Sequence, residues 1–172
     1  MWEWDSNFLM VLVTVVGVLV SCATIVIDRF RANESRQREL FMQLYDSFAS
    51  SDFQKSWSDV IYNWQWESTE DFLKKYGPGS NLAAWASATS VSLYFEGIGV
   101  LVKKKMININ LVGELMSTTV KWFWEKTARV TRDYRQMTSN QHLFENFEYL
   151  YAEIDRREKV NAEKTRKTGR SA

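Results

Sequence analysis

Hydrophobic residues form one unbroken run near the start of the chain. From Phe8 to Ile27 no residue is charged, and Val, Leu, Ile, Phe and Met dominate these 20 positions. A helix of this length would extend about 30 Å, which is the thickness of a bilayer core. The pattern predicts a transmembrane helix over about residues 8–27, inside a membrane anchor formed by residues 1–29.

The flanks of this run indicate an orientation. Trp2 and Trp4 precede it, where indole rings favour the headgroup region, and Arg29 and Arg31 follow it. Basic residues are retained on the cytoplasmic side of a membrane. We therefore expect these four residues at the membrane interfaces of a single-pass protein of the cytoplasmic (inner) membrane, with the N-terminus outside and the C-terminal domain in the cytoplasm.

Two other interpretations of the run are a cleaved secretory signal and a lipoprotein processing site at Leu19–Cys22. Secretory signals begin with basic residues and have a shorter apolar stretch, whereas this chain begins with acidic residues and stays apolar through Ile27. We favour an uncleaved helix. In it, Gly17 and Ser21 are small enough for a partner helix to approach closely.

The rest of the chain has the spacing of amphipathic helices. Ser50–Asp52, Ser68 or Thr69, and Asn108 or Asn110 are of the types that cap helix N-termini, and Gly77-Pro78-Gly79 ends one helix. The pattern predicts a cytoplasmic bundle of about five or six helices over residues 30–160, with the helices over 81–105 and 111–134 forming an antiparallel hairpin. The expected helices are 30–48, 52–66, 69–76, 81–105, 111–134 and 140–159.

Residues 161–172 form a polar, basic tail with no apolar face. By itself such a segment is expected to be disordered, and a neighbouring subunit or the membrane surface could order it. We therefore predict partner contacts for its four basic residues, Lys164, Arg166, Lys167 and Arg170.

Composition narrows the function classes. The 172 residues carry a formal charge of +1, which leaves no general attraction for nucleic acid. There is one cysteine, Cys22, and one histidine, His142, and no glycine-rich phosphate loop. We expect no enzyme, no cofactor, no nucleic acid and no small-molecule substrate.

Three stretches resemble a known family. They are Leu93–Asn108 with its Glu-Gly-Ile-Gly core, the pair Trp124-Glu125, and Asn146–Leu150. Over about residues 34–155 the chain is similar to a family of uncharacterised bacterial, membrane-anchored helical proteins classed as a domain of unknown function. The resemblance implies a helical fold and assigns no activity. Glu96 and Glu125 match acidic positions of that family, and Gly97 stands where a second acid is common.

The acids on these helices raise the question of a metal site. Carboxylates from several helices of a bundle can bind two metal ions, but such sites use a Glu-x-x-His motif. Here His142 precedes Glu145, which is the reverse order. We therefore predict no metal, and expect Glu96 and Glu125 to be structural polar residues paired with a base.

Beyond the membrane segment the chain has six tryptophans, more than a small core normally needs. Trp64 and Trp66 cannot both point inward from one helix face, so this pair is expected to contact a partner. The leading hypothesis is a non-catalytic accessory or scaffold subunit of a larger membrane complex, with other membrane-protein subunits and the lipid bilayer as partners. The alternative is a free-standing membrane-tethered regulatory or signalling module that binds a soluble cytoplasmic partner.

Overall fold

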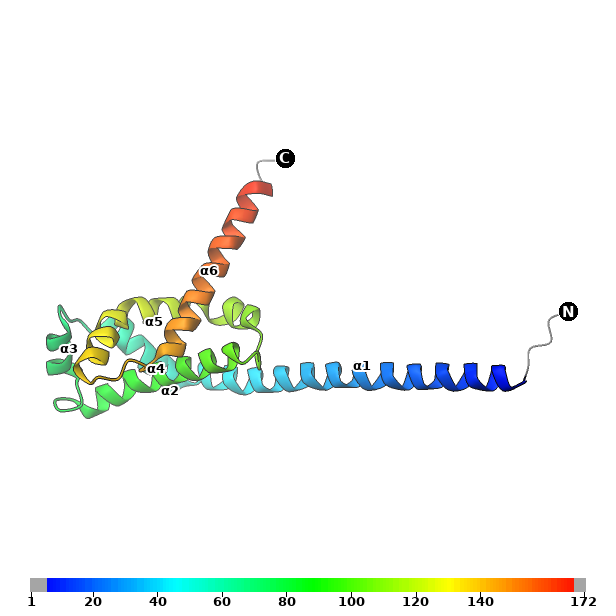
Figure 1. Ribbon diagram of the computed structural model, residues 1–172. Coiled ribbons are helices and arrows are strands. Elements are labelled where there is room, and N and C mark those ends of the chain that lie inside the picture. The colour runs from blue at the N-terminus through cyan, green and yellow to red at the C-terminus, as the bar shows by residue number, and fades with distance from the viewer. Residues whose placement is uncertain (1–5, 169–172) are drawn as a thin grey trace. The chain divides into compact units, whose positions relative to one another are not determined.

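The computed structural model describes residues 6–168, except for the side chains of residues 6–9, 11–13, 30, 33, 165, 167 and 168. The chain divides into two compact units, Met1–Met42 and Gln43–Ala172. Figure 1 shows that the described elements are helices and their connections, and no strand occurs among residues 6–168. The all-helical prediction is confirmed for this part of the chain.

Helix α1 (Ser6–Ala49) supplies all the described structure of the first unit. It is continuous, which agrees with the absence of glycine and proline between residues 18 and 49. Its polar residues in the apolar stretch are satisfied locally, because Thr14, Ser21 and Thr24 donate their hydroxyl protons to carbonyls one turn earlier. The helix therefore needs no outside partner for these groups.

The predicted transmembrane helix is wrong: none of the helices that the structure describes has the length and apolar character to cross a membrane. The expected inner-membrane location and the lipid and membrane-protein partners stay predictions.

The second unit is a bundle whose elements are α2 (Ser51–Ser58), the π-helix η1 (Asp59–Asn63), α3 (Thr69–Tyr76), α4 (Leu82–Lys103), α5 (Ile109–Met137) and α6 (Glu145–Thr168). Helices α2, α3 and α5 begin at caps that the sequence predicts, and α4 begins at a further cap, Asn81. Side chains of Ser50, Ser68, Asn81 and Asn108 accept hydrogen bonds from backbone amides of the first turns.

The core of the bundle lies where α4, α5 and α6 meet. Phe95 of α4, Phe123 of α5 and Phe147 of α6 are at most 1% exposed, and their ring centroids lie 5.0 to 6.2 Å apart. The backbones come closest between α4 and α6, whereas α4 and α5 meet through large side chains. The two consecutive helices of the predicted hairpin, α4 and α5, are therefore held together largely by α6, which packs against both.

Helix α6 begins and ends later than expected. The chain makes further turns over residues 138–144 before the helix starts at Glu145, and the helix continues to Thr168. The described part of the predicted tail is therefore helical. Its exposed residues Lys164 and Arg166 extend α6 without an apolar face.

Candidate functional site

Glu96, the acid in the family-like stretch, holds the start of α6. Its carboxylate accepts a hydrogen bond from the backbone N–H of Phe147 and another from the side-chain amide of Asn146, both 2.7 Å long. The first-turn N–H groups of a helix lack partners within that helix. Glu96 therefore acts as an N-terminal cap supplied by a different helix, and its expected pairing with a base is wrong.

Gly99, one turn further along α4, allows this capping. A Cβ atom added to Gly99 would lie 2.0 Å from the carbonyl oxygen of Asn146, so the two backbones touch. At Gly97 an added Cβ would meet nothing within 4 Å. The two glycines therefore have different roles. Gly99 is required for the close approach of α4 and α6, whereas Gly97 is exposed.

The other acids are placed apart from one another. Glu125 is exposed and accepts a bond from the Tyr151 hydroxyl at 3.3 Å, so its expected pairing with a base is also not seen. Glu114 is exposed on the first part of α5. Glu145 pairs with His142 at 2.7 Å, and this hydrogen bond holds the pKa of Glu145 below its ordinary value.

Glu148 joins α6 to α5 through two arginines. Its carboxylate accepts bonds from Arg132 at 2.8 Å and from Arg135 at 2.6 Å. Burial raises the pKa of Glu148, but these hydrogen bonds outweigh burial and leave the pKa below its ordinary value. Among the described residues, no three histidines, cysteines or acids gather as metal ligands would.

The tryptophan pair singled out from the sequence is placed differently from the expectation. The helical region ends at Asn63, and Trp64 has an extended backbone, so the argument from a single helix face does not apply. Trp64 is 9% exposed and stacks on Tyr76 at 4.3 Å, while Trp66 is half-buried beside Phe72. Trp64 therefore has little surface to offer, and a partner contact of the pair stays a prediction.

Lys126 fixes the end of the π-helix beneath these rings. Its ammonium group donates to the carbonyls of Ile61 at 2.6 Å and Trp64 at 2.9 Å, and lies 5.1 Å from the centre of the Trp66 ring. Burial lowers the pKa of Lys126. In a continuing helix, backbone N–H groups further along the chain would donate to these two carbonyls. Lys126 donates to them instead, which accounts for the end of the helical region at Asn63.

Exposed aromatic surface occurs instead at Tyr62 and Trp122, which are 61% and 47% exposed. Both lie against Trp57, which is buried and donates its ring N–H to the carbonyl of Thr119. Helical spacing alone did not identify Tyr62, because it belongs to a π-helix whose turn is wider than that of an α-helix.

Four of the remaining predicted contact residues lie on α1. Gly17, Ser21, Arg29 and Arg31 are exposed on α1, and Gly17 has open space around its Cα. Trp2, Trp4 and Arg170, together with the side chain of Lys167, lie outside the described residues.

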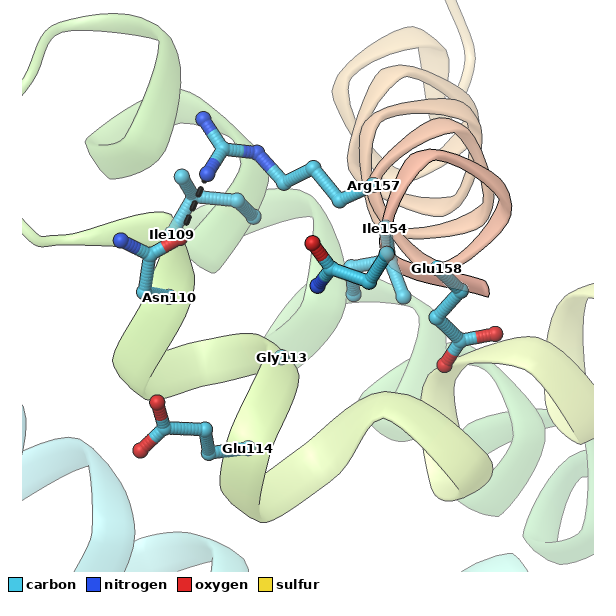
Figure 2. A pocket seen from close by; sticks show the side chains of 8 residues that line it. Ile109, Asn110, Gly113, Glu114, Ile154, Arg157 and Glu158 are labelled. Carbon is cyan, nitrogen blue, oxygen red and sulfur yellow. Dashed lines mark hydrogen bonds between the residues drawn. The ribbon is translucent and has the colours of Figure 1, made fainter. Parts of the chain in front are cut away.

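A polar hollow of about 320 Å³ lies between the beginning of α5 and the second half of α6. Figure 2 shows Arg157 reaching from α6 to Asn110 on α5, where its guanidinium donates to the amide oxygen at 2.5 Å. Glu114 of α5 and Glu158 of α6 also line the hollow, each from its own helix (Figure 2). The Arg157 guanidinium is therefore held by both Glu153 and Asn110.

Comparison with known proteins agrees with the resemblance found in the sequence. Residues 11–154 match the model of a family described as a domain of unknown function (DUF4760). No curated protein and no solved structure matches the chain. The match includes Glu96, Gly99 and the start of α6, which together form the α4–α6 junction described above. The chain therefore belongs to the DUF4760 family, and the predicted membership of a family of unknown function is confirmed.

Proposed function

We propose that the protein is a non-catalytic accessory or scaffold component that binds other proteins through the apolar part of α1. The observation that carries this proposal is the exposure of large apolar side chains along one helix. Exposed apolar surface of this extent marks an interaction site in proteins. Eight such residues are 47% to 64% exposed: Val15, Val16, Val18, Leu19, Val20, Ile25, Val26 and Ile27.

The distribution of these side chains favours burial on several sides. Val18, Leu19 and Val20 are consecutive, and in an α-helix consecutive residues point about 100° apart. A helix that is apolar all round is stable when other protein surrounds it. A single shallow contact would leave much of this surface in water, so the proposed partner contributes more than one helix or wraps around α1.

Small residues on α1 would admit a partner helix closely. Thr14, Gly17, Ser21 and Thr24 are spaced by three and four residues, so they lie along one side of the helix. The hydroxyls of Thr14, Ser21 and Thr24 already donate within α1. Burying them therefore leaves no unpaired donor, and this stripe supports tight packing against an apolar partner.

The carboxylates of the bundle support the non-catalytic part of the proposal. The Glu96 carboxylate caps α6, and the Glu148 carboxylate forms ion pairs with Arg132 and Arg135. These contacts hold the helices together. In this proposal, binding of α1 brings the bundle into the complex.

Native purification of a tagged chain tests this proposal. We expect the wild-type protein to co-purify with a partner at a fixed stoichiometry. The double variant V18N/L19N should lose that partner, because amide side chains in the interface would need hydrogen bonds that an apolar partner does not offer. The matched control is Leu93→Asn, which changes an apolar residue of α4 that is 57% exposed; this variant should retain the partner.

A wild-type protein that purifies alone would contradict the proposal and would favour the alternative of a free-standing regulatory module. Loss of the partner in the Leu93→Asn variant with retention in V18N/L19N would move the binding surface to the bundle.

A further inference from the structure

A second hollow, separate from the polar one, opens among α3, α4 and α5. Its volume is about 110 Å³, and no residue that lines it is charged. Its floor is buried, whereas its rim, which includes Trp85, Tyr134 and Phe144, is half-exposed. This geometry is that of an apolar depression open to solvent on one side.

Small side chains create the hollow. Ala88 and Ser92 of α4 face Thr127 and Thr131 of α5 across the floor, at positions where longer side chains would fill the space. Ser92 donates its hydroxyl proton to the carbonyl of Ala88 at 2.9 Å, and Thr127 donates to that of Phe123 at 2.7 Å. These donors are satisfied within their own helices, so water in the hollow gains few hydrogen bonds from them.

Aromatic rings form the rim. Trp85 and Tyr134 have centroids 5.3 Å apart, and Phe72 lies 6.4 Å from Trp85 at the buried end. Rings in such tilted arrangements offer both faces and edges to another ring. The rim therefore favours a flat or compact apolar guest over an extended polar one.

The connection between α5 and α6 supplies the remaining wall, through Leu143 and Phe144. Phe144 has a φ of 55°, a conformation that is uncommon for a bulky residue. Arg135 holds this segment by donating to the carbonyl of Leu143 at 2.8 Å. Strained backbone of this kind concentrates at ligand sites, where neighbouring contacts keep it in place.

We propose that this hollow is a binding site for a small uncharged apolar molecule, or for the uncharged end of a larger one, with a single ring or a short alkyl group. An apolar cavity of about 150 Å³ is known to accept benzene, so about 110 Å³ with an open side suits a guest of that size. The absence of charged lining residues disfavours ionised guests. This site is independent of the partner-binding role proposed for α1.

The test uses purified full-length protein and toluene as the probe, with benzoate as a charged molecule of similar shape. At ten times its dissociation constant, toluene should raise Tm by about 4 °C and shift the indole N–H resonance of Trp85. Benzoate should do neither. Thr89→Leu places a larger side chain at the half-exposed rim and should weaken toluene binding at least tenfold.

Two further variants serve as a second filling substitution and as a control. Ala88→Val fills the floor and should also weaken binding, which covers the case in which Thr89→Leu does not fold. Gly113→Ala adds a methyl group in the polar hollow, where it meets no atom within 4 Å, and should leave toluene binding unchanged. Wild-type protein that shows no toluene-dependent shift of Trp85, or a Tm rise that is the same in the filled variants, would overturn the proposal.

Discussion

The two units of the chain treat apolar residues in opposite ways. In the bundle, Val91, Phe95 and Leu150 have no measurable exposure, whereas Val18 and Leu19 of α1 are 56% and 64% exposed. Both regions are rich in hydrophobic residues and both are helical. The difference shows that hydrophobic content does not by itself determine burial: the bundle buries its own apolar side chains, whereas those of α1 are exposed, and we propose that a partner protein covers them.

The largest expected effect contrasts a buried side chain with an exposed one. Phe95→Ala removes a ring that packs against Phe123 and Phe147, and should lower the free energy of unfolding by about 4 kcal/mol. Val18→Ala should change it by less than about 0.5 kcal/mol, because the side chain is exposed in the isolated chain. Urea denaturation of both variants measures the difference; equal losses would abolish the contrast between the units.

The next effect concerns the glycines of α4. Gly99→Ala should cost about 3 kcal/mol, because the new methyl group collides with the backbone of Asn146 and forces α6 away. Gly97→Ala is the matched control and should raise stability by about 0.5 to 1 kcal/mol, since alanine favours the helix and the position is open. Thermal and urea unfolding should rank the two variants on opposite sides of the wild type. Similar values would mean that α4 and α6 do not touch at Gly99.

A smaller effect is expected for the cap from α4. Glu96→Gln should lower the free energy of unfolding by about 1.5 kcal/mol, because a neutral amide binds the Phe147 N–H and the Asn146 amide less strongly than a carboxylate does. Glu125→Gln should be close to neutral, because its single described bond, from Tyr151, is long and exposed. Hydrogen exchange of the Phe147 amide provides a local measurement: faster exchange is expected for Glu96→Gln alone.

The smallest effect depends on pH. The arginines lower the pKa of Glu148 in the folded state, so the pair stabilises the protein above the pKa of the unfolded chain, about 4.3. This contribution is lost as pH falls through the lower folded value. Glu148→Gln should therefore differ from the wild type at pH 7 and approach it towards pH 3. Glu34→Gln on α1, whose pair with Arg38 is exposed, should match the wild type at every pH.

The structural features that could be predicted from the sequence are those formed by residues close together in the chain. The caps at Ser50, Ser68 and Asn108 satisfy amides within three residues, so their chemistry is readable from neighbouring letters. The cap of α6 comes from Glu96, which lies 51 positions before Phe147, and no local pattern records that distance. The sequence pattern places the start of this helix near residue 140, whereas the helix begins at Glu145.

Contacts between segments that are far apart in the sequence also determine where the two tryptophans pack. Lys126 holds the carbonyl of Trp64 and turns the chain out of the helix, so both Trp64 and Trp66 can pack on α3. The expected membrane span failed for a different reason. A run of apolar residues predicts a helix without showing what surrounds it, and none of the helices that the structure describes can cross a membrane.

Site-specific photocrosslinking in cells tests most directly whether α1 is the binding region. A photoreactive residue at position 18 samples the exposed apolar side of α1, and one at position 93 samples an exposed apolar position of α4. The account predicts a discrete protein adduct from position 18 that is absent from position 93. No adduct at position 18, an adduct with lipid alone, or the same protein adduct from both positions would contradict it.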